Sequence, residues 1–251
     1  MIELYPLHAI DEVRPGDDLP CILADAINAQ DLNPTRLDVL VVTQKIVSKQ
    51  EGRFVDLASV TPSLEAIELA RVTQKDARFV ELVLTESAAV IRAAANVLIT
   101  RHRSGHVMAN AGIDRSNTGP GNIDQVLLLP VDADASAVQL HAALKTYWPQ
   151  APAVVISDSF GRPWRYGVTN VAIGVSGLPA LIDRRGERDR NGRRLEVTQV
   201  AFADLIAAAA GLATGEGAEG VPAVLVRGLR WIAQERAASS LVRPIEEDLF
   251  T

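Results

Sequence analysis

Apolar runs rich in β-branched residues recur along the chain, and the segments between several of them have the spacing of helices. The runs cover residues 37–48, 96–100, 125–131, 153–159, 168–178 and 223–229. Helix patterns over residues 18–30, 63–74 and 136–148 begin at Asp18, Ser63 and Ser136, residue types that cap helix N-termini. This alternation predicts an α/β or mixed α+β fold, built as a single module over residues 1–251 or as two closely joined lobes.

Composition limits the class of protein. Hydrophobic residues make up 48% of the 251 residues, so the chain can bury a large core, but no run of about 18 apolar residues is present to span a membrane. The first residues lack the basic and apolar regions of a signal peptide, so we expect a cytoplasmic protein. The net charge of -6 argues against nucleic-acid binding, and Cys21, the single cysteine, excludes an internal disulfide.

The hexapeptide GEGAEG, residues 215–220, has the G-x-G-x-x-G spacing of a dinucleotide-binding turn. That turn needs a strand before it and a helix after it, because the helix N-terminus binds the pyrophosphate. Here an alanine-rich helix pattern, residues 201–213, precedes the glycines, and a strand pattern, residues 221–229, follows them. The order is reversed, so the sequence does not predict a Rossmann fold. It also lacks the G-x-x-x-x-G-K-[ST] pattern of a P-loop.

Polar residues at the ends of apolar runs are the candidates for chemistry. Lys49, four residues after Lys45, could hold a phosphate as a point charge; the alternative is that both lysines are solvated on a strand or turn. Asp114 and Asn117 lie among small residues that let a ligand approach, and Asp is a ligand for Mg²⁺ or Mn²⁺. The alternative for that segment is a turn.

A third candidate follows the apolar run at residues 153–157. Asp158 and Ser159 are expected at the carboxyl end of a buried strand, where sites in α/β proteins gather. Two aspartates from separate strand ends could share a divalent ion that bridges nucleotide phosphates, with Arg162 and Arg165 as clamps for an anionic group. A capping turn at Asp158 is the alternative.

Two further patterns are weaker. His102 and His106 are four residues apart, but Ser104 and Gly105 interrupt the helix that would align them on a zinc ion. The arginine-rich segment, residues 183–194, predicts a solvated hairpin, with attraction of an anionic substrate tail as the alternative.

Six stretches, read in chain order, resemble the coenzyme F420-0:gamma-glutamyl ligase family across nearly the whole chain. They are IDEVRPGDDL, VVTQKIVSKQEGR, NAGIDRSNTGPG, VVISDSFGRPWRYGVTNVAIGVSG, GEGAEGVPAVLVRG and SSLVRPIEEDLF. The resemblance implies a GTP-dependent ligase that adds L-glutamate to a deazaflavin coenzyme and releases GDP and phosphate. It also implies a two-lobed family fold, an intertwined homodimer, two Mn²⁺ or Mg²⁺ ions per site, and stimulation by K⁺.

The resemblance also implies roles for individual residues. Lys49, Asp114 and Asp158 would carry the catalysis, and metal would be held by Asp114, Asp158, Ser159 and Glu216, with Glu219 as the alternative to Glu216. GTP would contact Ile10, Asp11, Glu12, Val13, Gln44, Lys49, Asn117, Thr214, Gly215, Glu216, Gly217, Ala218 and Glu219; at Gln44 relatives often have a small hydroxyl residue.

The chain departs from the family pattern at Asp11, where relatives usually have proline, and we expect no C-terminal flavin-reductase-like domain. Two other functions stay open at this point. One is a nucleotide- or deazaflavin-dependent oxidoreductase, suggested by GEGAEG, and the other is a non-catalytic nucleotide-binding module.

Overall fold

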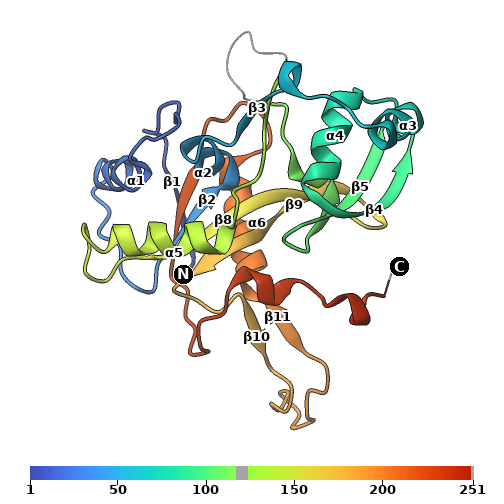
Figure 1. Ribbon diagram of the computed structural model, residues 1–251. Coiled ribbons are helices and arrows are strands. Elements are labelled where there is room, and N and C mark those ends of the chain that lie inside the picture. The colour runs from blue at the N-terminus through green and yellow to red at the C-terminus, as the bar shows by residue number, and fades with distance from the viewer. Residues whose placement is uncertain (117–123, 250–251) are drawn as a thin grey trace.

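The computed structural model describes residues 1–116 and 124–249, and it is organised around a five-stranded sheet (Figure 1). The strands lie in the order β1 (Glu3–Pro6), β12 (Ala223–Arg227), β2 (Val39–Thr43), β8 (Ala153–Arg162) and β9 (Arg165–Ser176). In this sheet β2 and β8 pair in parallel, whereas the other three pairings are antiparallel. A doubly wound parallel sheet of the Rossmann type is therefore not what these strands form.

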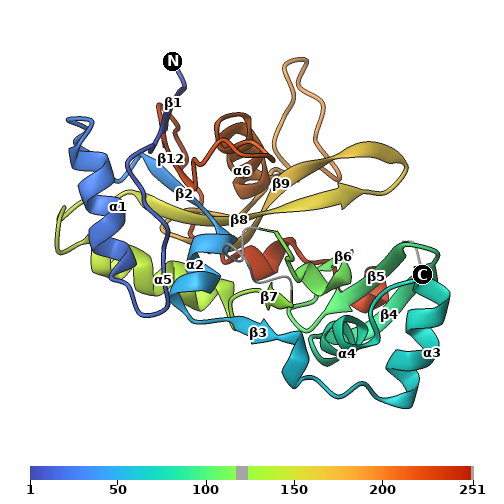
Figure 2. The ribbon, with the colours of Figure 1, turned by 90° about the horizontal axis from the view of Figure 1, so that it is seen from above.

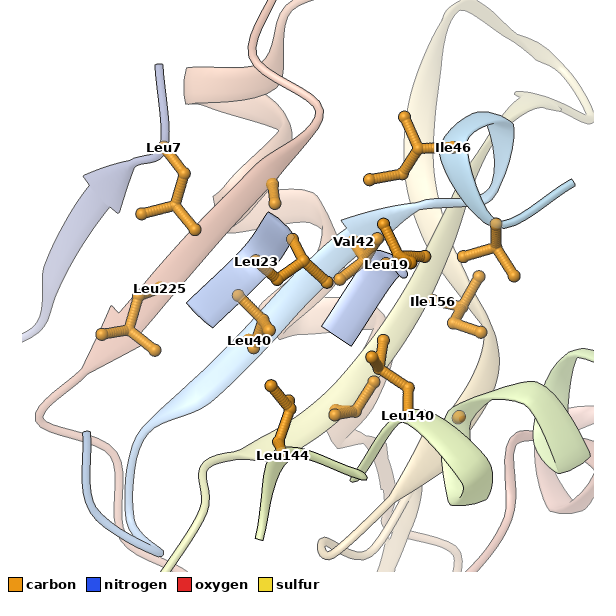
Figure 3. Packing of buried hydrophobic residues seen from close by; sticks show 14 of the residues in the cluster. Leu7, Leu19, Leu23, Leu40, Val42, Ile46, Leu140, Leu144, Ile156 and Leu225 are labelled. Atoms are coloured by element: carbon orange, nitrogen blue, oxygen red, sulfur yellow. The ribbon is translucent and has the colours of Figure 1, made fainter. Parts of the chain in front are cut away.

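Helices cover both faces of the sheet, because its central strands are apolar on both sides. On one face, α1 (Leu19–Asn28) and α5 (Ala133–Leu144) pack on Leu40, Leu225 and Ile156 (Figure 3). On the other face lies α6 (Phe202–Thr214), opposite α5 (Figure 2). Its alanines pack against alternate residues of the same strands. Nearly continuous apolar strands are what burial on both faces requires.

The residues between β2 and α5 in the chain form further helices and strands. After α2 (Gln44–Gln50) the chain builds α3 (Leu64–Thr73) and α4 (Ala77–Thr85), a two-stranded and a three-stranded sheet, and a hydrophobic cluster of their own. Figures 1 and 2 show α3, α4, β4 and β5 grouped at one side, away from α1. The small strands are β3 (Phe54–Asp56), β4 (Ser87–Ala94), β5 (Val97–His102), β6 (Val107–Ala109) and β7 (Gln125–Leu127).

The arginine-rich segment lies in an exposed hairpin that begins with β10 (Leu181–Asp183) and returns through β11 (Gln199–Ala201). A bridge between Arg188 and Arg194 pairs its two sides near the tip. The expectation of a solvated hairpin is confirmed.

Most of the predicted elements are present, with two corrections at their ends. Asp18 and Ser63 cap α1 and α3 as predicted. Ser136 does not cap α5, because the helix begins earlier and Asp132 accepts the backbone N–H of Ala135. Asp158 does not end β8 either, since the strand continues to Arg162 with β9 as its partner.

The mixed arrangement of helices and several sheets agrees with the predicted fold class. Over residues 1–116 and 124–249, the helices are too short or too polar to cross a bilayer. The intertwined homodimer stays a prediction.

Candidate functional site

Four segments distant in sequence meet at one edge of the main sheet because of how its strands pair. The parallel strands β2 and β8 are in register at Thr43 and Ser157, so the start of α2 lies beside Asp158. The antiparallel β12 begins at the same edge, where the backbone N–H of Thr43 donates to Pro222 at 2.9 Å. The segment after β1 is held there too, by a 2.9 Å bond from Leu7 to Ala223.

A cavity of about 400 Å³ opens at this edge. Its size falls within the range of about 300–1,000 Å³ that small-molecule sites occupy. We call it the sheet-edge cavity. It gathers most of the predicted site residues, namely Ile10, Asp11, Glu12, Gln44, Lys49, Asp158, Ser159, Thr214, Gly215, Glu216, Gly217 and Ala218.

The two lysines of α2 make different ion pairs at this edge. Lys49 is nearly buried, with 6% of its side chain exposed, and its ammonium pairs with the exposed carboxylate of Glu12. Lys45 Nζ lies 2.9 Å from Asp114 Oδ2. Neither lysine lies on a strand, because both are on α2, which directs them to carboxylates from other segments. Lys45 keeps 39% of its side chain exposed, whereas Lys49 does not stay solvated.

The glycine-rich loop after α6 places its two glutamates differently. Ser159 Oγ donates to the Glu216 carboxylate, at 2.7 and 2.8 Å from its two oxygens. Glu219 instead accepts the backbone N–H of Gly217 at 2.8 Å, so its carboxylate folds back on its own loop. Glu216 is thus the glutamate that joins the strand residues, and Glu219 shapes the loop.

Gly215 allows this arrangement. Its φ of +66° is disfavoured for residues with a Cβ, and a Cβ there would lie 2.2 Å from Glu219 Cδ. Glycine is required at this position by the positive φ and by the Glu219 carboxylate. In a dinucleotide-binding turn it would instead be required by a pyrophosphate at the start of the following helix.

Asp158 is the carboxyl group with the most altered acidity in the sheet-edge cavity. Burial raises its pKa to about 7, and the negative charges of Asp114 and Glu216 add to the effect. Lys45 and the backbone N–H of Ser159 act in the opposite direction. Three carboxyl groups from separate segments therefore interact electrostatically at one point.

Unpartnered polar atoms line the same cavity. Ser157 Oγ and Thr214 Oγ1 are buried and have no hydrogen-bond partner among the described residues. Buried polar groups without partners are uncommon in proteins and often mark the place of a ligand, ion or water. No three His, Cys, Asp or Glu side chains form a ready metal cluster within residues 1–116 and 124–249.

The donor types nevertheless suit a hard divalent cation, which prefers carboxylate and hydroxyl oxygens. Asp158, Glu216 and Ser159 supply such oxygens, and a cation would relieve the repulsion that raises the Asp158 pKa. Asp114 could also bind the cation if the ion replaced its present partners. These are Lys45 and Ser116, which donates to Asp114 Oδ1 at 2.7 Å.

Among the described residues, the other predicted candidates do not line this cavity; of these, Asp114 pairs with Lys45 and Glu219 accepts from Gly217, both of which do line it. Val13 is buried in the main core next to Glu12, and Arg162 donates to the backbone carbonyl of Tyr166 at the hairpin end. Asn117 lies outside the described residues. Arg165 is exposed at the start of β9.

The cavity residues that the sequence did not select as site residues include Lys45 and Asn170. Lys45 had the same signal as Lys49 but was not selected. Asn170 on β9 stands opposite Ser159 in the ladder, a juxtaposition that depends on strand register and leaves no local sequence signal.

Comparisons with known proteins decide the family. The profile described as F420-0:Gamma-glutamyl ligase matches residues 8–228. The chain belongs to the F420-0:gamma-glutamyl ligase family. The coenzyme F420:L-glutamate ligase of Methanopyrus kandleri is 42% identical over 253 residues, which cover 99% of this chain and 96% of the relative.

Two other members of the F420-0:gamma-glutamyl ligase family are similar along their whole length. The coenzyme F420:L-glutamate ligase of Methanothermobacter thermautotrophicus is 41% identical over 99% of this chain and 98% of the relative. The protein of that name from Natronomonas pharaonis is 43% identical over 98% of this chain and 93% of the relative. The resemblance inferred from the six stretches is confirmed, and the matched range includes the sheet-edge cavity.

Proposed function

We propose that the protein is a GTP-dependent ligase that joins L-glutamate to the carboxylate of the deazaflavin coenzyme F420-0 and can add further γ-linked glutamates. Family membership supports the ligation, and three relatives are named coenzyme F420:L-glutamate ligases. The observation that carries the chemistry is the convergence of Lys49, Asp158 and the glycine-rich loop at one cavity.

The reaction needs a carboxylate to be activated before an amine can attack it. In the proposed sequence, the γ-phosphoryl group of GTP passes to the coenzyme carboxylate, which gives an acyl phosphate and GDP. The amine of L-glutamate then attacks the acyl carbon, forms the amide and expels inorganic phosphate. Phosphoryl transfer depends mainly on positioning and on neutralising charge.

The residues of the chain supply those two functions. Lys49 is held nearly buried, so its charge acts in a medium of low dielectric constant on a phosphate that replaces Glu12 as its partner. The loop from Gly215 to Gly217 carries no side chain at either glycine, so its backbone can approach the nucleotide, and the Glu219 carboxylate packed against both glycines fixes its shape.

Divalent metal would be held by Asp114, Asp158, Ser159 and Glu216, with Mn²⁺ or Mg²⁺ as the ions and two per site. When bound, such ions neutralise phosphate charge during transfer. K⁺ stimulation is part of the proposal, and comparing initial rates in equimolar KCl and NaCl checks it.

A single incubation tests the function. The protein is mixed with GTP, Mn²⁺, L-glutamate and F420-0, and the coenzyme is analysed by mass spectrometry while GDP is quantified. The proposal expects a coenzyme heavier by one or more glutamyl residues and repeated GDP formation, beyond one equivalent per protein, only when glutamate is present. GTP binding without glutamate-dependent GDP release would instead support a non-catalytic module, and an unchanged coenzyme with every metal would refute the ligase.

A further inference from the structure

A second cavity, of about 560 Å³, lies away from the nucleotide segments. We call it the His106 cavity. It opens between the β5–β6 turn, the start of α5, β9 and the segment around Ala238, and it shares no lining residue with the sheet-edge cavity. Its polar side chains include Arg53, Glu86, His102, Arg103, His106 and Asp132.

The His106 cavity is linked to Asp158, one carboxylate of the proposed reaction, through the contact between His106 and Phe160. The His106 ring packs edge to face against Phe160, with their centroids 5.7 Å apart. Phe160 follows Asp158 by two residues in a regular part of β8, so both side chains project from the same face. With a rise of about 3.3 Å per residue, Asp158 and Phe160 are about 7 Å apart along the strand.

The charged groups of the His106 cavity have both signs. Arg53 pairs with Glu86 at 3.1 Å, and Arg103 donates to the backbone carbonyl of Thr85. Asp132 caps α5 through one carboxylate oxygen. A wall that carries guanidinium groups and carboxylates together suits a ligand that is itself both cationic and anionic, such as a free amino acid.

The two histidines of this cavity have ring nitrogens that no other protein group satisfies. Among the described residues, the His106 ring nitrogens have no hydrogen-bond partner, although the backbone carbonyl of His106 accepts from His102. Burial lowers the His106 pKa to about 4, which keeps the ring neutral and able to accept a hydrogen bond. His102 Nε2 is buried without a hydrogen-bond partner, 3.8 Å from Glu86 Oε2. Such groups are expected to meet a ligand or water.

We propose that the His106 cavity binds L-glutamate, with its amine beside His106 and directed toward Asp158 and its carboxylates toward Arg103. This inference rests on the proposed ligase function, in which the amine must reach a carbonyl near Asp158. Nucleotide and amino acid then approach the reacting carboxylate from different cavities. The neutral His106 ring accepts a hydrogen bond from the amine without repelling it.

Two variants test the assignment. His106→Phe keeps the aromatic contact with Phe160 and removes both ring nitrogens, and Arg103→Gln removes a positive charge at the exposed mouth. Each is expected to raise the KM for L-glutamate about tenfold, as the loss of one hydrogen bond to a charged group does, with the KM for GTP changed less than twofold. Arg71→Gln, exposed in the last turn of α3 and outside both cavities, is the matched control and should leave both constants unchanged.

Calorimetric titration of L-glutamate alone into the wild-type protein and both variants separates this inference from the proposed function. Heat of binding in the wild type that is weakened about tenfold in the variants supports the glutamate site, whether or not turnover is observed. Active enzyme with an unaltered KM for glutamate in both folded variants overturns it. The glutamate site is also overturned if the wild-type protein neither binds L-glutamate nor turns over. Melting temperatures near that of the wild type confirm that the variants fold.

Discussion

At the scale of residues, the site combines one nearly buried cation with three interacting carboxyl groups. Lys49 and Glu12 form a pair that a phosphate can replace, because the lysine is fixed by its helix and the glutamate is exposed. Asp158 carries the opposite feature, a negative charge that the surroundings disfavour. The residues therefore present a phosphate partner and a cation partner side by side.

Removing the charge of either aspartate should stop turnover without unfolding the protein. Asp114→Asn and Asp158→Asn are each expected to lower kcat about a thousandfold, since metal-assisted charge neutralisation is worth several kcal/mol. Rates of GDP release at limiting Mn²⁺ measure the effect, and Asp25→Asn on the exposed face of α1 is the control. Wild-type rates in both site variants would contradict the metal assignment.

The raised pKa of Asp158 has a consequence for stability in metal-free protein. Its pKa is about 7 in the folded protein, against 3.8 for an ordinary aspartate such as that of the unfolded chain. The folded state therefore favours the protonated carboxyl group, and the free energy of unfolding falls as the pH rises from about 4 to about 7. Each unit corresponds to about 1.4 kcal/mol, and water access makes that an upper value. The Asp158→Asn variant does not lose stability in this way, because asparagine does not ionise.

The melting temperature of Asp158→Asn should accordingly exceed that of the wild type at pH 8, with a difference that shrinks toward pH 4. Thermal unfolding in EDTA across this range measures it. A constant difference at all pH values would mean that Asp158 ionises normally in the folded protein. Added Mn²⁺ should reverse the order at pH 8, because the wild type alone gains a charged ligand.

At the scale of elements, the loop between α6 and β12 is shaped by glycines with different surroundings. Gly215 and Gly220 both have positive φ, at +66° and +68°, but only a Cβ at Gly215 would meet Glu219. Gly215 also has a ψ of -177°, a conformation that glycine alone adopts readily, so alanine there meets both backbone strain and the Glu219 carboxylate. Alanine at Gly220 meets only the strain of its positive φ.

Gly215→Ala should weaken GTP binding strongly, since Glu219 must leave Gly217 and the loop loses its shape. Gly220→Ala should carry only the cost of about 1 kcal/mol that alanine has in the left-handed region. We expect the KM for GTP to rise more than tenfold in the first variant and less than about threefold in the second. Equal effects would show that Glu219 has no part in positioning the loop.

Local signals explain which elements could be predicted. Asp18 and Ser63 begin helices because their side chains accept N–H groups of the first turn, a rule that acts within a few residues. Ser136 follows the same rule but lies behind Asp132, which already caps α5, and its hydroxyl donates to Glu51 instead. Because Asp132 and Ser136 are both capping residue types, four positions apart, the sequence alone does not decide where α5 begins.

Long-range pairing explains what could not be predicted. β8 extends to Arg162 because β9 supplies hydrogen bonds beyond the point where β2 ends. Asp158 was predicted at the end of a strand, but it lies within β8. It lines the sheet-edge cavity because the neighbouring strand β2 ends at Thr43, opposite Ser157. Asn170 and the His106 cavity depend likewise on register and on contacts across the fold, and no short stretch of sequence carries them.

At the scale of the whole molecule, the sheet and its helices form the scaffold, and the hairpin from β10 to β11 projects from it (Figure 1). Within the hairpin, Arg184 pairs with Glu187 and Arg185 with Asp183, while the tip is exposed. Its backbone bonds are internal, as between Gly186 N–H and the carbonyl of Leu195 at 2.8 Å. The tip thus adds little burial to the core.

Replacing residues 187–194 with an Asn-Gly turn should therefore leave the melting temperature within about 2 °C, because exposed segments contribute little to stability. The same variant should add the first glutamate at the wild-type rate, since both cavities lie elsewhere in the fold. Differential scanning calorimetry and the mass distribution of the coenzyme measure the two effects. A normal first addition with loss of longer γ-glutamyl products would assign the arginines to the growing anionic tail, and a large drop in melting temperature would show that the hairpin supports the core.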